Sequence, residues 1–221
     1  MVKVLELFSG TGSVGKVCKE LGWEVVSVDM ILPADHQCNI LDFDYKQYNK
    51  DEFDIVWASP PCINYSAYKK WWFGRKLKDG TIYSKEQNDK DQDEADRLVL
   101  KSFEIIDYFK PSLWFMENPA TGSLKDRIIM KDKPFYDIDY CMYSDWGYKK
   151  KTRIWTNKKD FEPLLCNKQC GNMIGDKHKN ILPGCGSQHN EPKDLKHLGK
   201  GTNRIDRYRI PPDLIYSLFL L

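Results

Sequence analysis

The chain has 221 residues, of which 41% are hydrophobic and 30% are charged, and its formal net charge is +2. This composition is typical of one well-packed globular domain, and no apolar run is long enough to cross a bilayer, which excludes a membrane-spanning protein. Seven cysteines, an odd number, without a signal-peptide pattern argue against a disulfide framework and indicate an intracellular, cytoplasmic protein.

The small net charge conceals an uneven distribution along the chain. Residues 149–209 hold 15 Lys and Arg against 6 Asp and Glu, whereas residues 1–148 hold 19 against 25. A basic C-terminal third beside an acidic body suggests that one face binds a polyanion such as a nucleic acid. A solvated, lysine-rich surface would give the same pattern.

The first part of the chain alternates short apolar runs with turns. Residues 2–8 predict a buried strand, and residues 14–21 have helical spacing that stops at Gly22. Two more strands are predicted over residues 23–28 and 51–58. This order is typical of a Rossmann-like α/β fold, in which a mostly parallel sheet is covered by helices on both faces.

Later segments are more polar and less regular. The elements expected there are a long loop over 64–92, an amphipathic helix over 94–109, strands over 113–116 and 152–156, a small irregular subdomain over 160–203, and a closing helix over 210–221. The long loop carries Trp71 and Trp72, which could fill the space left by a displaced base or could anchor the loop on the core. Its basic residues could contact phosphates; they are Lys69, Lys70, Arg75, Lys76 and Lys78.

The turn after the first strand carries a nucleoside-binding pattern. Gly10-Thr11-Gly12-Ser13-Val14-Gly15 satisfies G-x-G-x-x-G, and Asp29 ends the next predicted strand. Such a turn lets the backbone approach a ligand closely, and the acid accepts hydrogen bonds from a ribose. Nicotinamide dinucleotides and S-adenosylmethionine both present a ribose, so these residues alone leave both cofactors open.

A single thiol follows the strand predicted over 51–58. In Ser59-Pro60-Pro61-Cys62 two prolines restrain the backbone just before the cysteine, at the sheet edge where α/β enzymes keep their chemistry. A lone cysteine at a strand end is more often a packing residue. The prolines, and Glu117 at the end of the next strand, favour a reactive pair.

In this order the motifs resemble those of the DNA cytosine-5 methyltransferases. The similar segments are Leu7-Phe8-Ser9-Gly10-Thr11-Gly12 (first motif), Asp29 (the acidic residue after the second strand), Cys38-Asn39-Ile40 (third motif), Ser59-Pro60-Pro61-Cys62 (fourth), Glu117-Asn118-Pro119 (sixth) and Lys151-Thr152-Arg153-Ile154-Trp155 (a reduced eighth). The resemblance covers residues 2–156. It departs from the family at Asn39, where an Asp is common, at Pro119, where Val is usual, and in keeping one arginine of the usual two.

The resemblance implies a class I S-adenosylmethionine-dependent fold. Its catalytic domain would span residues 1–156, followed by a small basic target-recognition segment over 157–203 and a C-terminal segment over 204–221 that returns to the catalytic domain. The implied cofactor is S-adenosylmethionine, and the implied cofactor-binding residues are Phe8, Ser9, Gly10, Thr11, Gly12, Asp29, Met30, Asn39, Ile40 and Pro60.

The resemblance also implies the chemistry. Cys62 would add to C6 of a cytosine flipped out of double-stranded DNA, Glu117 would hydrogen-bond the base, and Arg153 would contact the base or the thiol. The same chemistry on RNA, and a catalytically silent DNA-binding relative, remain alternatives. We expect a monomer that acts in the cytoplasm or together with DNA and has no membrane partner.

A cluster of metal-binding residue types lies in the basic C-terminal third. Its members are Cys166, Cys170, His178, Cys185 and His189. Cys-x3-Cys followed by Cys-x3-His is compatible with tetrahedral zinc, and so is a set that uses His178. Unligated thiols on an ordinary loop would give the same sequence.

Overall fold

The computed structural model describes residues 1–180 and 208–220. Its main sheet has the strand order β2-β1-β3-β4-β6-β5. The strands are β1 (Lys3–Leu7), β2 (Glu24–Val28), β3 (Ile55–Ala58), β4 (Leu113–Pro119), β5 (Phe135–Asp139) and β6 (Lys151–Thr156). The first four run parallel, β6 runs antiparallel to β4, and β5 runs antiparallel to β6. The predicted mostly parallel α/β fold is confirmed.

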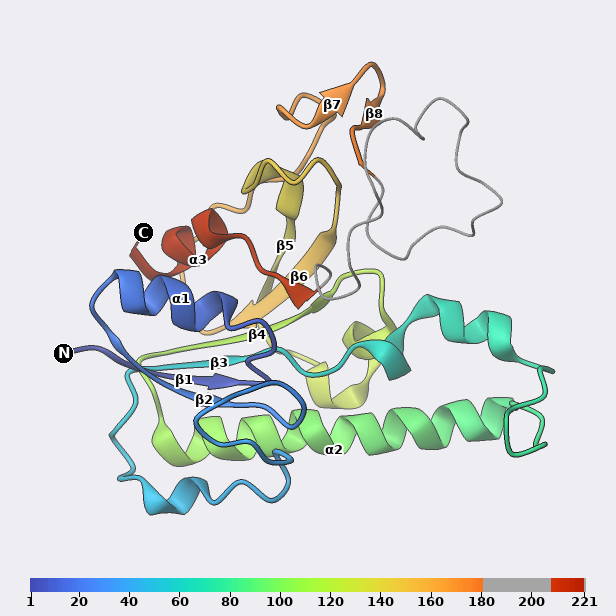
Figure 1. Cartoon of the computed structure of the whole chain (residues 1–221), viewed down its shortest axis with the longest axis horizontal. Coiled ribbons are helices and arrows are strands. Elements are labelled where there is room, and N and C mark those ends of the chain that lie inside the picture. The colour runs from blue at the N-terminus through green and yellow to red at the C-terminus, as the bar shows by residue number, and fades with distance from the viewer. Residues whose placement is uncertain (181–207, 221) are drawn as a thin grey trace.

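Helices cover both faces of this sheet (Figure 1). Helix α2 (Lys85–Phe109) lies on one face, and α1 (Ser13–Glu20) and α3 (Pro212–Leu220) lie together on the other. Because successive strand residues point to opposite faces, Val56 packs in the core under α2 and Trp57 in the core under α1 and α3. Both side chains are fully buried.

The strands lie where the apolar runs predict them, but α2 is longer than expected. It begins at Lys85, so the predicted loop over 64–92 was wrong at its C-terminal end. Ser84 caps the helix by accepting a hydrogen bond from the backbone N–H of Gln87 (3.2 Å). The rest of the predicted loop contains two short 3-10 helices, Ile63–Tyr65 and Ala67–Trp72. Strand β5 was not predicted.

Beyond β6 the chain leaves the sheet. A small hairpin of β7 (Met173–Ile174) and β8 (Lys177–His178) projects beyond β5 in Figure 1. Helix α3 then packs beside α1, where Phe219 stacks on Trp23 with ring centroids 5.7 Å apart. Among the described residues, no helix is both long and apolar enough to cross a membrane. The proposed division at residues 156 and 203 remains a prediction.

Candidate functional site

The turn after β1 leaves room beside its backbone. Phe8, Gly10 and Gly12 have φ angles of 57°, 52° and 66°, in the left-handed region that glycine adopts without a steric cost. A Cβ atom placed on Gly12 would meet no atom within 4 Å. The glycine pattern therefore forms an open turn at the carboxyl end of β1, and its shape fits a nucleoside ligand.

Asp29, directly after β2, lies beside this turn and binds its backbone. Its Oδ2 accepts a hydrogen bond from the Gly10 N–H (2.9 Å), and its Oδ1 accepts from the N–H groups of Ile31 and Leu32 (2.8 Å each). A carboxylate has about four acceptor positions, so one remains for a ribose hydroxyl. The neighbouring Met30 and Ile31 are 60% and 74% exposed and offer apolar surface to a base.

The remaining predicted cofactor residues have mixed environments. Asn39 accepts a hydrogen bond from the Leu41 N–H through Oδ1 (3.0 Å), whereas the side chain of Ile40 packs in the core. Thr11 Oγ1 lies 3.0 Å from Ser13 Oγ. Together with the open turn and Asp29, these residues fit S-adenosylmethionine, with Ile40 limited to a backbone contact.

Glu6 on β1 is a buried carboxyl that the sequence analysis did not single out. It is 3% exposed, and its two oxygens accept the N–H groups of Val14 (3.2 Å) and Gly15 (2.9 Å) at the start of α1. Burial raises its pKa to about 7, although the two backbone N–H groups oppose the shift. Glu6 thus ties β1 to the start of α1, on either side of the glycine turn.

The segment that carries the thiol, residues 59–62, is restrained by neighbouring strands. The Ser59 N–H donates to the last carbonyl of β1 (3.2 Å), and Ser59 Oγ accepts from the indole N–H of Trp57 (2.8 Å). The Asn118 amide on β4 donates to the Pro60 carbonyl (2.9 Å). Cys62 is half-buried, so a restrained thiol stands at the carboxyl edge of β3.

Glu117 lies at the end of β4, next to this segment. It is 7% exposed, and its Oε1 accepts the Tyr140 hydroxyl (3.1 Å) and lies 3.4 Å from Lys150 Nζ. Burial raises the pKa of Tyr140 and the carboxylate raises it further, so Tyr140 stays a protonated donor. Both contacts fix the carboxyl group through the same oxygen.

Arg153 does not lie beside Glu117. Glu117 stands opposite Ile154 on β6, and because strand side chains alternate, Arg153 points to the other face of the sheet. There its guanidinium donates to both oxygens of Asp137 (2.7 and 3.1 Å) and lies over the Phe135 ring. Its catalytic role stays a prediction, and the cation that contacts Glu117 is Lys150.

After Cys62 the chain docks on α2. Tyr65 donates its hydroxyl to Asp96 (2.8 Å), and Lys69 Nζ contacts Asp91 Oδ2 (2.6 Å). The prediction that Lys69 contacts phosphates was wrong, because that side chain is buried and paired. Trp71 is 73% exposed, as a residue that contacts DNA requires, whereas Trp72 packs against Tyr83. Arg75, Lys76 and Lys78 are exposed.

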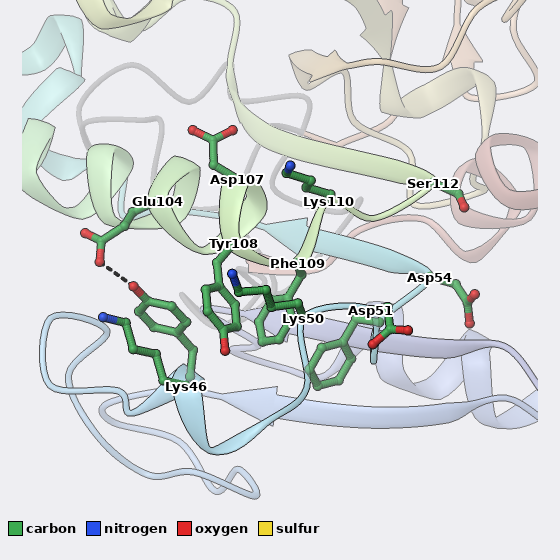
Figure 2. Close-up of a pocket in the computed structure, with 12 residues that line it drawn as sticks. Lys46, Lys50, Asp51, Asp54, Glu104, Asp107, Tyr108, Phe109, Lys110 and Ser112 are labelled. Atoms are coloured by element: carbon green, nitrogen blue, oxygen red, sulfur yellow. Dashed lines mark hydrogen bonds between the residues drawn. The ribbon is translucent and has the colours of Figure 1, made fainter.

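One hollow of the described surface lies away from the thiol. Its volume is about 680 Å³, and it is lined by residues before β3 and at the C-terminal end of α2, such as Asp54 and Lys110 (Figure 2). Both residues adjoin the amino ends of their strands, opposite the edge that carries Cys62. In α/β sheets ligands bind at the carboxyl ends of the strands, so the edge with the thiol is the candidate site.

The predicted cysteine and histidine cluster is found in part. Cys166, Cys170 and His178 lie together, and the fold adds Cys141, which directly follows Tyr140 after β5. Cys185 and His189 lie outside the described residues. Cys141 was missed because it stands 25 positions before Cys166, and only the fold brings the two together. Lys150 and the bond from Asn118 to Pro60 were missed because in both cases only the fold brings the partners together.

Comparison with known proteins identifies relatives of the chain. No family model matches the chain. The chain is 39% identical over 223 residues to a Frog virus 3 protein named "Probable DNA (cytosine-5)-methyltransferase", and the match covers 98% of each sequence. The solved structure of the methyltransferase EhMeth from Entamoeba histolytica matches with a TM-score of 0.50 at 16% identity, over 75% of this chain and 56% of that one.

A second solved structure, the S. pombe Dnmt2 methyltransferase, matches with a TM-score of 0.44 at 11% identity, over 77% of this chain and 56% of that one. The chain therefore spans a little over half the length of these two solved proteins, whereas it spans nearly all of the viral relative. At these identities EhMeth bears on the fold alone.

Proposed function

The chain belongs to the DNA (cytosine-5)-methyltransferase family, and we propose that it transfers a methyl group from S-adenosylmethionine to C5 of cytosine in double-stranded DNA, with Cys62 as the nucleophile. The observation that carries the proposal is the restrained thiol segment, which is tied through Pro60 to Asn118 on the strand that also carries Glu117. The thiol of Cys62 and the buried carboxyl of Glu117 thus stand at the same edge of the sheet as the open turn at Gly10 and Gly12.

The need for a nucleophile follows from the chemistry of the base. C5 of cytosine is a weak nucleophile because it is part of an aromatic ring. When the Cys62 thiolate adds to C6, the C5–C6 double bond is broken and C5 becomes enamine-like. Cysteine suits this step because a few per cent of its thiol is ionised near neutral pH.

Glu117, protonated or sharing a proton with the base, is proposed to donate a hydrogen bond to N3 and to accept one from the exocyclic amino group. Negative charge builds on the ring when the thiolate adds, and a positioned hydrogen-bond partner lowers the energy of that state. Because Tyr140 and Lys150 contact Oε1, we propose that Oε2 faces the base. Arg153 remains a predicted contact of the base, which would require it to leave Asp137.

The cofactor supplies an electrophilic methyl group on a sulfonium. The residues proposed to bind it are Asp29, which would accept from the ribose, and the open turn at Gly10 and Gly12. After methyl transfer C5 carries both a methyl group and its original hydrogen. Loss of that proton to a base restores the double bond and expels Cys62 as a thiolate.

The target atom is shielded inside duplex DNA, so the base must leave the stack, at a cost of a few kcal/mol. The exposed Trp71 and the exposed basic residues after it are proposed to contact the DNA around the vacated position. The residues 157–203 are proposed to contribute to target recognition, since they lie in the basic C-terminal third of the chain and hold 8 Lys against 5 Asp and Glu.

Identification of the methylated product distinguishes a DNA methyltransferase from an RNA methyltransferase and from a catalytically silent relative. The purified chain should be incubated with methyl-labelled S-adenosylmethionine and with duplex DNA or tRNA of matched cytosine content. We expect 5-methylcytosine in the DNA after nucleoside analysis. Label in the tRNA alone would support the RNA alternative, and cofactor binding without any label would support the silent one.

A further inference from the structure

Three thiols and one imidazole converge between the end of β5 and the β7–β8 hairpin. The ligand atoms of Cys141, Cys166, Cys170 and His178 all lie within 4.8 Å of one another. Cys166 Sγ is 3.6 Å from Cys170 Sγ and 3.5 Å from His178 Nε2, and Cys170 Sγ is 3.4 Å from the same nitrogen. These residues come from three separate segments of the chain, so their convergence is a property of the fold.

The distances match a zinc tetrahedron. With Zn–S bonds of about 2.3 Å and Zn–N bonds of about 2.0–2.1 Å, tetrahedral geometry separates two sulfurs by about 3.8 Å and a sulfur from a nitrogen by about 3.5 Å. The triangle of Cys166, Cys170 and His178 has these edge lengths within a few tenths of an ångström. Cys141 supplies the fourth donor.

Neighbouring groups orient the sulfur of Cys166. The Lys168 N–H donates to Cys166 Sγ (3.4 Å), a contact that favours a thiolate. The Cys166 N–H donates to Asp139 Oδ2 (2.8 Å), and Lys149 lies 3.1 Å from the same oxygen. Such contacts around the ligands hold a metal site in shape.

The surrounding segment has almost no core of its own. Within residues 161–180, only Phe161 and Asn172 are buried. Strands β7 and β8 have two residues each, and an isolated two-stranded hairpin is marginally stable in water. A bound metal would supply the folding free energy that apolar burial does not supply here.

The hairpin is also fastened to the region after β5. The Asn172 amide donates to the carbonyls of Cys141 (2.8 Å) and Ser144 (2.7 Å) and accepts from the Gly147 N–H (3.0 Å). Asn180 donates to the Trp146 carbonyl (2.9 Å). A metal bound at the four ligands would therefore join the hairpin to the edge of the catalytic sheet.

We propose that Cys141, Cys166, Cys170 and His178 bind one structural zinc ion that fixes the β7–β8 hairpin to the catalytic domain. The ligand set differs from the one that sequence spacing suggests, because Cys141 takes the fourth position and neither Cys185 nor His189 is required. The site has four protein ligands, as structural zinc sites do, and takes no part in methyl transfer.

Metal content of the full-length chain, purified without chelator, tests the proposal. We expect about one zinc per chain, the stoichiometry of a single structural site, by elemental mass spectrometry. The single variants Cys141→Ser, Cys166→Ser, Cys170→Ser and His178→Ala should each lose most of it. Cys38→Ser, Cys185→Ser and His189→Ala are matched controls that should keep it.

Cobalt substitution of the wild-type chain gives a second readout that does not depend on a variant that folds. Co²⁺ in place of zinc should give thiolate-to-cobalt charge transfer and the visible absorption of a tetrahedral ion. Wild-type protein that binds neither metal overturns the proposal. So does a Cys141→Ser variant with full zinc, or loss of zinc from Cys185→Ser or His189→Ala, since either places the ligands elsewhere.

Discussion

The side-chain amide of Asn118 donates a hydrogen bond to the carbonyl of Pro60, at 2.9 Å, in a part of the molecule that is closed to solvent. The bond joins the end of β4 to the segment that carries Cys62. Because Glu117 immediately precedes Asn118, one short stretch of β4 positions both the proposed nucleophile and the proposed partner of the base.

We expect Asn118→Ala to impair catalysis beyond its effect on stability. The Pro60 carbonyl would lose its buried donor, which costs about 1–3 kcal/mol of folding free energy. A looser thiol should slow methyl transfer at saturating cofactor by ~10-fold or more. Urea unfolding measures the effect on stability, and single-turnover rates measure the effect on catalysis.

Asn157→Ala is the matched control for this variant. Asn157 bridges the other end of β4, where it accepts the Trp114 N–H (2.8 Å) and donates to the Ser112 carbonyl (3.0 Å). It should lower stability and leave the rate per folded molecule unchanged. If both variants slow transfer equally, the Asn118 bond has no special role in positioning the thiol.

Lys150 should matter for turnover because it contacts Glu117. Lys150→Met removes the cation 3.4 Å from Oε1 and should lower the transfer rate by ~10-fold, whereas Glu117→Gln should lower it by ~100-fold or more. The transfer rate of Arg153→Met, measured in the same assay, shows whether Arg153 or Lys150 is the cation that supports catalysis. Unchanged turnover in Lys150→Met would show that its contact with Glu117 is structural only.

Glu6 should make stability fall as the pH rises from about 4.5 to about 7. Its folded-state pKa of about 7 lies above its ordinary value of 4.5, so the native state binds the extra proton in that window. The stability that Glu6 provides is full below the window and lost above it. The difference in unfolding free energy between wild type and Glu6→Gln should therefore shrink by ~2–3 kcal/mol across it.

Glu104→Gln is the control for the pH series. Hydrogen bonds from Lys101 and Tyr45 hold the pKa of Glu104 below its ordinary value, so its titration lies below pH 4.5 and adds no slope between pH 5 and 8. Urea titrations at half-unit intervals test both variants. A wild-type slope identical to that of Glu6→Gln would contradict the assignment of the buried proton to Glu6.

The exposed Trp71 should contribute to DNA binding and not to folding stability. A tryptophan that stacks on a base contributes about 1–3 kcal/mol to binding, so Trp71→Ala should weaken binding to a duplex with a mismatched target cytosine and leave the melting temperature unchanged. Trp72→Ala, which removes a packing contact with Tyr83, should lower the melting temperature. Unaltered DNA affinity in Trp71→Ala would exclude its stacking role.

Sequence reasoning found the parallel core because its signal is local. The strands β1 to β4 are short apolar runs, and the residues that follow them meet at one edge by the geometry of a parallel sheet. The start of α2 was missed because residues 85–93 are all polar and show no helical periodicity. The capping pair of Ser84 and Gln87 was the available signal.

The side-chain partners in the site depend on contacts that the sequence does not encode locally. The motif predicts a catalytic role for Arg153. The strand register instead places Arg153 opposite Asp137, and Lys150 is the cation beside Glu117. Cys141 joins the Cys166 cluster only because β5 ends where the hairpin docks. The sequence identifies residue types, and the tertiary fold chooses their partners.

The most direct test of the account is a covalent trap on DNA that contains 5-fluorocytosine. Because fluorine replaces the C5 hydrogen, the last elimination cannot occur, and in the presence of S-adenosylmethionine a stable protein–DNA adduct should accumulate. Tandem mass spectrometry should place the bond on Cys62, Cys62→Ala should form none, and Cys38→Ser should form the wild-type amount. An adduct that persists in Cys62→Ala, or none from a protein that binds both substrates, would contradict the account.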